Sequence, residues 1–280
     1  MAKVDFFDEI LIEPGLKTDI ELICQGPEWA PEGKENLVYQ AAKLLLNSCG
    51  PQNVIPAEAG IKITLTKNIP TGSGLGSASS DAAATLIGLN RFLQPAGKVD
   101  VGAGLRACPQ GNHKGLPLRK MAAALGSDVA FFLGGPLAFC TGKGEKIKKL
   151  AKKFNFSALL ILPDVSVSTK KVYANYRHNR PLYEKLNTRI NGYIQKNRFD
   201  LVSEMCANML ETSCFSLYKE LAELKAKIES SGIAPCCLSG SGSAMFCIMS
   251  SRDEERAGEN RRKLKQQIGC KSIIVNNNRW

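Results

Sequence analysis

The sequence has no apolar segment long enough to cross a bilayer, which takes about 20 consecutive apolar residues as a helix. The uncharged stretch 129–142 is interrupted by glycines and a proline. The first residues include aspartates and a glutamate, and they lack the apolar core of a signal peptide. We therefore expect a soluble, cytoplasmic protein without a membrane partner.

Histidine is scarce, and the cysteines have no metal-binding spacing. The chain has 2 histidines and 10 cysteines, with no CxxC pair. Common zinc modules depend on such pairs, so a structural zinc site is not expected. Most of the cysteines stand in apolar runs, where we expect small buried thiols of a reducing compartment.

Acidic residues are too few to balance the basic ones, and the formal net charge is +11. Such a charge attracts anions without distinguishing nucleotides, polyphosphates and nucleic acids. The basic segments 143–153 and 261–271 contain no aromatic residue, so a stacking platform for single-stranded nucleic acid has little support. We expect these segments to be solvated faces and expect no nucleic-acid partner.

The chain instead contains strand-like and helix-like segments that we assign to two lobes, residues 1–150 and 151–280. Strict alternation over residues 61–67 predicts a half-buried strand. Residues 10–13 and 19–24 are expected to start a hairpin or meander around Pro14 and Gly15.

Further elements of the two lobes follow from periodicity and from turn residues. We expect a helix over residues 81–93, capped by Ser79 or Ser80, and strand-like pieces around a turn within 129–140. Residues 95–117 carry glycines and prolines without periodicity, which predicts a long surface loop. The other expected elements are helices over 37–46, 118–125, 182–194 and 217–230, a buried strand over 158–162, and two strands within 235–249.

A glycine-rich segment between the predicted strand at 61–67 and the helix that follows is the strongest chemical signal. Its glycines, Gly72, Gly74 and Gly76, allow backbone N–H groups to approach an anion, and the helix adds its positive dipole end. The segment lacks the lysine of a P-loop and the third glycine of a dinucleotide fingerprint. It predicts a phosphate cradle, in which a side chain at Gly74 would take the space of the phosphates. An ordinary glycine-serine loop is the alternative.

A second signal is Asp128, a lone carboxylate among small and apolar residues. A buried carboxylate needs partners or a chemical role, because desolvation disfavours its charge. A chemical role is one interpretation, and a helix-end cap is the other. Further along, Ser-Gly-Ser-Gly-Ser at 239–243 is more often a tight turn between strands when considered alone.

In combination, these segments resemble the motifs of a known family. Pro-Thr-Gly-Ser-Gly-Leu-Gly-Ser-Ala-Ser-Ser followed by Asp-Ala-Ala resembles the ATP-binding motif of the GHMP kinases, which act on galactose, homoserine, mevalonate and phosphomevalonate. The segments around Asp128, 162–173 and 238–246 resemble those of its diphosphocytidyl-methylerythritol kinases. The resemblance implies an α/β (α+β) fold of two lobes. The first would be ribosomal-protein-S5-like and bind ATP, and the second would place an antiparallel sheet and helices on the substrate side.

The same resemblance implies the site residues. Asp128 would act on the acceptor hydroxyl, Ser80 would lie near Mg²⁺, and Gly240 and Gly242 would support the phosphate loop. The cytidine-diphosphate-linked substrate would be bound by Thr169 and by the ring of Tyr173, although a core position is the alternative for that tyrosine. The residues implied for ATP are Asn36, Pro70, Thr71, Gly72, Ser73, Gly74, Leu75, Gly76, Ser77, Ala78, Ser79 and Ser80.

The function implied is ATP-dependent phosphorylation of the 2-hydroxyl of 4-diphosphocytidyl-2-C-methyl-D-erythritol, in the methylerythritol phosphate route to isoprenoid precursors. Two alternatives remain open, another small-alcohol kinase of the family and a non-catalytic nucleotide- or RNA-binding paralogue. Family members also begin with an Ala-Lys strand and a Gly-Tyr-His turn that have no counterpart here. We expect Lys3 to lie too close to a strand starting at Asp5 to replace that lysine, and we expect such a segment to precede Met1.

Overall fold

The computed structural model describes the chain in ten stretches and divides it into two compact units. Unit 1 comprises Met1–Lys3, Phe7–Ile69 and Gly76–Leu150, and unit 2 comprises Val4–Phe6, Pro70–Leu75 and Ala151–Trp280. The chain therefore passes from unit 2 into unit 1 between Leu75 and Gly76. The described residues are 1–15, 19–49, 60–93, 118–141, 146–150, 155–198, 201, 206–233, 235–249 and 254–277.

Unit 1 contains a three-stranded sheet in the order β1-β3-β2. Its strands are β1 (Glu9–Gly15), β2 (Ile20–Gln25) and β3 (Gly60–Thr66). The predicted alternation of β3 is confirmed, since Ile61, Ile63 and Leu65 are buried while the residues between them are half-buried. The expected hairpin of the first two strands is wrong. β3 lies between them, antiparallel to β1 and parallel to β2. In this central position both edges of the apolar strand β3 are paired and neither is left exposed.

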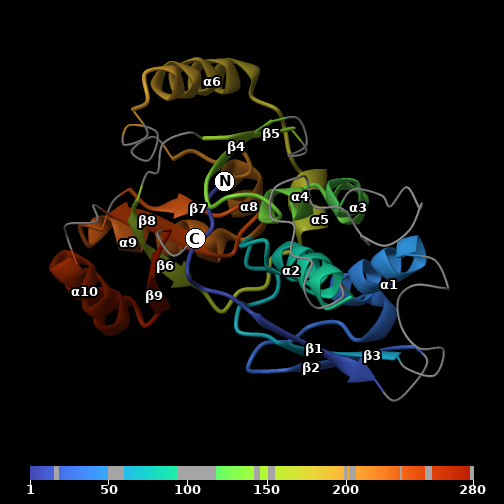
Figure 1. Ribbon diagram of the computed structural model, residues 1–280. Coiled ribbons are helices and arrows are strands. Elements are labelled where there is room, and N and C mark those ends of the chain that lie inside the picture. Colours follow the sequence, from blue (N-terminus) through green and yellow to red (C-terminus); the bar gives the residue numbers. More distant parts are fainter. Residues whose placement is uncertain are drawn as a thin grey trace. The chain divides into compact units, whose positions relative to one another are not determined.

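Helices cover one face of this sheet, as Figure 1 shows for α1 (Leu37–Cys49) and α2 (Ser77–Phe92). The 3-10 turn η1 (Gly33–Glu35) leads into α1, and α3 (Leu118–Leu125) packs against both α1 and α2. The buried faces of these helices and of the sheet form one apolar core, in which Leu45, Leu86 and Leu118 have no exposed surface.

The segment predicted as strand-like pieces within 129–140 is a helix followed by a strand. It forms α4 (Val129–Phe132) and then β4 (Ala138–Thr141), which pairs with β5 (Lys146–Lys149). The short run Val129 to Phe131 is buried against the helices of unit 1, so its apolar character reflects burial and not an extended backbone. Such short apolar runs do not distinguish a buried helix from a buried strand.

Unit 2 is built on a four-stranded antiparallel sheet in the order β7-β8-β6-β9. Every residue of β6 (Ser157–Leu162) is buried, which confirms the predicted buried strand. The other strands are β7 (Cys237–Leu238), β8 (Met245–Met249) and β9 (Lys271–Asn276). This sheet agrees with the expected second lobe of an antiparallel sheet covered by helices.

Helices of unit 2 pack against this sheet through the apolar cluster that includes Leu159, Leu221 and Met245. Figure 1 shows α9 and α10 beside the strands, whereas α6 carries no buried residue. The helical elements are α5 (Thr169–Ala174), α6 (Arg180–Gln195), α8 (Glu211–Leu217), α9 (Lys219–Ser230), α10 (Glu254–Lys263) and the π-helical turn η2 (Leu264–Ile268).

Three further expectations have different outcomes. The predicted loop 95–117 lies outside the described residues. The cap predicted at Ser79 or Ser80 is wrong, because α2 begins at Ser77 and its N-cap is Gly76 in the left-handed region. Within the described stretches, no helix is long and apolar enough to cross a membrane.

Candidate active site

The glycine-rich segment forms a loop in which every second residue from Gly72 to Gly76 has a positive φ. Gly72, Gly74 and Gly76 have φ values of 74°, 72° and 70°. Ser73 and Leu75 are not among the residues with positive φ. Glycine adopts positive φ at little cost, and a backbone without side chains at these three positions lets an anion approach closely. The three glycines therefore adopt the positive φ that the segment requires, and their role as a phosphate cradle stays a prediction.

The part of the loop in unit 2 is fixed by the segment that carries the second glycine cluster. The Ser239 hydroxyl donates to the carbonyl oxygen of Gly74 at 3.1 Å. The backbone N–H groups of Ser243 and Ala244 donate to the carbonyls of Gly72 and Ser73 at 3.2 and 2.9 Å. The packing of the two glycine loops, which was predicted, is therefore present within unit 2.

Gly74 is required by space as well as by backbone angle. An added Cβ would lie 2.2 Å from the carbonyl oxygen of Ser239 and 2.8 Å from that of Gly242. These are rigid backbone atoms, which cannot move aside as a flexible side chain could. The expectation that a side chain here would fill the space of the phosphates is corrected, because the Cβ direction points into the partner loop.

The predicted substrate segment reaches the same two loops. Thr169, at the start of α5, forms a hydrogen bond of 2.8 Å between its hydroxyl and that of Ser241. Asn208 donates to the carbonyl oxygens of Leu238 and Gly240 at 2.9 and 2.6 Å. Thr169 and Asn208 thus hold the second glycine loop, which in turn contacts residues 72–74. The contact made by Asn208 had no signal in the sequence.

In unit 1, the loop continues directly into the N-terminus of α2. Gly76 lies against the ring of Phe132, which an added Cβ would meet at 3.2 Å. The Ser80 hydroxyl donates to the carbonyl oxygen of Ser77 at 2.7 Å, so its oxygen lone pairs stay available for a cation. The first N–H groups of a helix lack internal partners, which makes this end suitable for phosphate.

Beneath the helix start lies a buried charged cluster formed by Asp8, Lys67, Ser77 and Asp81. The Lys67 ammonium is 2.5 Å from Asp8 and 3.0 Å from Asp81, and it also contacts the Ser77 hydroxyl. The side chains of Lys67, Asp8 and Asp81 are only 3%, 0% and 6% exposed. A single ammonium therefore compensates two buried carboxylates at the residue where α2 begins.

The two carboxylates of this cluster differ in electrostatics. Burial raises the pKa of Asp81 to about 7, with a contribution from the charge of Asp8, and the charge of Lys67 only partly opposes this. Burial also acts to raise the pKa of Asp8. However, hydrogen bonds from Lys67 and from the N–H groups of Ile69 and Asn68 outweigh it and hold this pKa below the usual range.

Sequence reasoning did not identify this cluster as functional, although one signal was available. Lys67 continues the series of alternate residues Ile61, Ile63 and Leu65, whose side chains face the core. A lysine at the next position of that series is directed inward, and a buried lysine requires carboxylate partners. The identity of those partners, in particular Asp8, depends on the fold.

Asp128 stands in the N-cap position of α4 but makes no capping hydrogen bond. The helix-cap alternative therefore has no support. Burial raises its pKa, while the nearby ammonium of Met1 acts in the opposite direction. Lys3 belongs to the same unit, and its ammonium donates to the carbonyls of Phe132 and Gly134 at 2.9 and 2.8 Å, at the end of α4.

The expectation about Lys3 assumed a strand that starts at Asp5. Instead, β1 begins at Glu9, and Asp5 belongs to unit 2, where its N–H donates to Asn276. Ala2 forms an isolated bridge with Leu137. The expectation that Lys3 lies too close to a strand at Asp5 is therefore wrong, because no strand begins at Asp5.

The remaining predicted residues differ in exposure. Asn36 is 4% exposed, and its amide donates to Pro31 and accepts from the N–H of Val38, which caps α1. Its proposed position near adenine stays a prediction. Tyr173 is 61% exposed on α5, so the alternative of a core position is excluded.

The position of a metal depends on the donors that are present. Within the described stretches, no group of three or more His, Cys, Asp or Glu side chains could hold a metal ion. Mg²⁺ at nucleotide sites is held by substrate phosphates together with a few protein oxygens, and in P-loop NTPases one of these is a Ser or Thr hydroxyl next to the phosphate loop. Ser80 is such a hydroxyl, so its predicted role is chemically consistent with the donor set.

The sequence of this chain matches a known protein family. The pattern of the GHMP kinases N terminal domain matches residues 36–135, and that of the GHMP kinases C terminal domain matches residues 190–267. The chain belongs to the GHMP kinases, as its motifs predicted. It is therefore an ATP-dependent kinase that acts on an alcohol group.

Individual relatives are more specific than the family. The chain is 31% identical to a 4-diphosphocytidyl-2-C-methyl-D-erythritol kinase of Geobacter metallireducens, over 100% of this chain and 85% of that protein. It is 30% identical to the kinase of the same name of Bacillus cereus, over 89% and 78% of the two chains.

Solved structures confirm the fold. A crystal structure of a 4-(cytidine 5'-diphospho)-2C-methyl-D-erythritol kinase has TM-score 0.66 and 28% identity, over 98% of this chain and 87% of that chain. A homoserine kinase from Cytophaga hutchinsonii has TM-score 0.72 over 99% and 88% of the two chains. At 22% identity, that second likeness bears on the fold alone.

Proposed function

We propose that this protein transfers the γ-phosphoryl group of ATP to the 2-hydroxyl of 4-diphosphocytidyl-2-C-methyl-D-erythritol, a step towards isoprenoid precursors. The observation that carries the proposal is the loop of alternating positive-φ glycines, which leads directly into the N-terminus of α2. The relatives of about 30% identity are named for this substrate, which supports the choice of alcohol. The cytoplasmic location expected from the sequence stays a prediction.

The phosphates of ATP would be bound by the backbone of residues 70–76 and by the first turn of α2. Fixed N–H dipoles in a preformed loop need no rearrangement as charge develops on the transferred group. The hydrogen bonds from Ser239, Ser243 and Ala244 hold the unit 2 part of this loop in shape. Ser80 would contribute its hydroxyl oxygen to Mg²⁺, which offsets phosphate charge when it is bound.

Asp128 would orient the acceptor hydroxyl and accept its proton. A carboxylate without a capping bond retains its lone pairs for this purpose. Burial raises its pKa, which makes it a stronger base than a solvated aspartate while it is ionised. General-base assistance of this kind is typically worth 10²–10⁴-fold in rate.

The substrate side would be α5 and the residues that precede it. The exposed ring of Tyr173 is available to stack on a cytosine base, an interaction worth about 1–3 kcal/mol per base. Thr169 presents a hydroxyl that is already oriented by its bond to Ser241. Both residues are exposed on a helix of unit 2, where a ligand can reach them.

The test is a coupled assay of ADP release with a panel of alcohols. The panel contains 4-diphosphocytidyl-2-C-methyl-D-erythritol, homoserine, mevalonate and galactose, each at the same concentration. We expect turnover with the first substrate to exceed the others by at least 100-fold in kcat/KM. A preference for one of the other alcohols would leave the chain a GHMP kinase and replace the proposed acceptor.

A further inference from the structure

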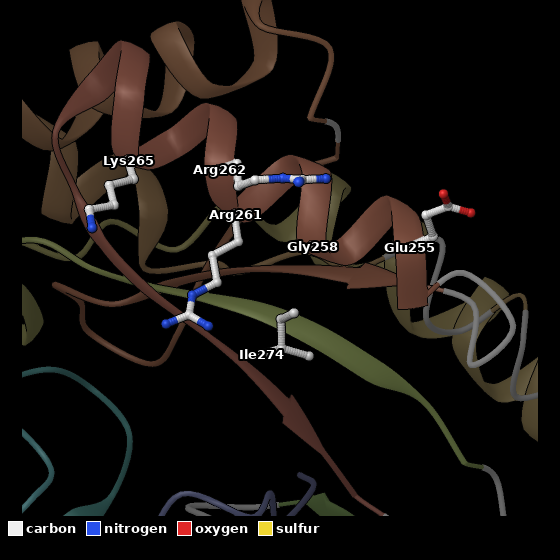
Figure 2. A pocket seen from close by; sticks show the side chains of 6 residues that line it. All are labelled: Glu255, Gly258, Arg261, Arg262, Lys265 and Ile274. Carbon is white, nitrogen blue, oxygen red and sulfur yellow. The ribbon is translucent and has the colours of Figure 1, made fainter.

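A shallow hollow on unit 2 lies apart in sequence from every residue assigned to the kinase site. It has a volume of about 530 Å³ and is bounded by α10, η2 and β9. Figure 2 shows its lining, which consists of Glu255, Gly258, Arg261, Arg262, Lys265 and Ile274. This volume is in the range of small-molecule sites.

Three cations, Arg261, Arg262 and Lys265, surround this hollow, which we call the α10 hollow. Arg261 and Lys265 are four residues apart and leave the helix on the same side, whereas the Arg262 side chain extends along the helix away from Lys265 (Figure 2). In the part of the chain that the structure describes, none of the three forms an ion pair with a carboxylate. Their charges are therefore not neutralised by those residues and would all attract an anion in the hollow.

Arg261 is anchored by a hydrogen bond, whereas Arg262 and Lys265 make none with a described residue. Its Nε donates to the carbonyl oxygen of Ser272 on β9 at 3.2 Å. This bond fixes the guanidinium plane and leaves the terminal nitrogens for a ligand. Figure 2 shows Arg261 and Lys265 leaving the helix on the side of Ile274. A held guanidinium next to an ammonium suits the oxygens of a phosphate group.

Gly258 and Ile274 give the hollow its space and its apolar part. A Cβ added at Gly258 would meet nothing within 4 Å, so this turn of α10 is open. Glycine costs about 1 kcal/mol relative to alanine in a helix interior, and no close packing against Gly258 explains its presence here. Ile274 is half-buried and offers an apolar surface beside the charges.

We propose that the α10 hollow binds a small molecule through a phosphate or diphosphate group. Arg261 and Lys265 would contact the anion, and Arg262 would add long-range attraction. The proposal is independent of the proposed kinase reaction, because it uses no residue of the phosphate loop and none of the substrate segment.

A small ligand fits this site better than a nucleic acid does. The lining has no aromatic side chain on which a base could stack. Glu255 stands at one end of the lining, where its charge would repel an extended chain of phosphates. The lining thus offers cations for one small anionic group and no platform for bases.

The test is calorimetric titration of inorganic diphosphate into the full chain at low salt. We expect Arg261→Gln and Lys265→Gln each to weaken binding by about tenfold, as expected for loss of a charge-assisted hydrogen bond. Gly258→Leu fills the hollow without changing the net charge, and it should weaken binding comparably. Any binding at the phosphate loop is recognised because these variants leave it unchanged.

The matched control is Lys263→Gln, which removes the same charge from an exposed position outside the lining. It should change the affinity for diphosphate by less than twofold. An equal loss in Lys263→Gln would mean that only net charge matters, and unchanged affinity in all variants would mean that the hollow is not the site. Either result overturns the proposal. So would tighter, steeply salt-dependent binding of a short single-stranded oligonucleotide that every one of the charge substitutions weakens alike.

Discussion

Ser239 and Gly74 are joined by a hydrogen bond of 3.1 Å from the serine hydroxyl to the glycine carbonyl, across 165 positions of the chain. The bond ties the proposed phosphate loop to the strand connection between β7 and β8. Gly74 also has no room for a Cβ on this side, so the two loops are closely packed within unit 2. The shape of the loop therefore depends on a segment near the other end of the chain.

Gly74→Ala should destabilise unit 2 and weaken ATP binding together. A left-handed alanine costs roughly 1–2 kcal/mol, and the contact with Ser239 adds to that cost. Chemical unfolding and calorimetric binding of ATP measure the two effects. Gly192→Ala is the control, because an added Cβ on this helix meets nothing within 4 Å, and it should be neutral or stabilising. Normal ATP affinity in Gly74→Ala would mean that this packing does not shape the loop.

Lys67→Met should strongly destabilise unit 1, by about 3–5 kcal/mol, since it leaves two carboxylates buried without compensation. The matched control is Lys62→Met on the same strand. Its partner Glu13 is 3.6 Å away, and the two side chains are 38% and 43% exposed. That surface pair should contribute no more than about 1 kcal/mol. Urea unfolding, monitored by circular dichroism, measures the free energy of unfolding of both variants. Equal losses of stability would contradict the account of the buried cluster.

Asp81 should make the protein less stable as pH rises from about 4 to 7. Its pKa is about 7 in the folded state and near 3.8 when unfolded, so the folded state binds more protons in this window. The contribution is complete below the unfolded value and is lost as pH rises through the folded value. Asp81→Asn should therefore flatten the difference in urea midpoint between pH 5 and pH 8. An undiminished difference in that variant would assign the pH dependence to other groups.

Asp128→Asn should retain ATP binding and lose turnover by on the order of 10²-fold or more, because an amide cannot accept the proton of the acceptor hydroxyl. The measurements are ADP release at saturating substrates and calorimetric ATP affinity. Asp19→Asn, at an exposed position of the same unit that has no assigned role, is the control and should behave as wild type. Near-normal turnover of a folded Asp128→Asn variant would remove Asp128 from the proposed mechanism.

Tyr173→Ala should raise KM for the cytidine substrate by about 5- to 150-fold, the equivalent of the 1–3 kcal/mol that stacking contributes. Tyr173→Phe keeps the ring and should keep KM. Because the side chain is 61% exposed, neither change should alter the melting temperature by more than a degree or two. Steady-state kinetics with both variants test this, and an unchanged KM in the alanine variant would place the base elsewhere.

Local sequence determined the elements whose periodicity matched their burial. The alternation of β3 and the uniformly apolar β6 were predictable because each side chain's burial follows from strand geometry. The glycine loop was predictable because only glycine adopts the left-handed angles of residues 72, 74 and 76 at little cost. These features depend on neighbours along the chain.

Tertiary structure decided what depends on distant partners. The position of β3 between β1 and β2 follows from which edges pair, and Gly74 faces Ser239 because two loops from different parts of the chain meet. The inward direction of Lys67 could be inferred from strand parity, but its compensation by Asp8 and Asp81 could not. A charge is tolerated in a core only where the fold brings its partners within hydrogen-bonding distance. The sequence alone does not specify those distances.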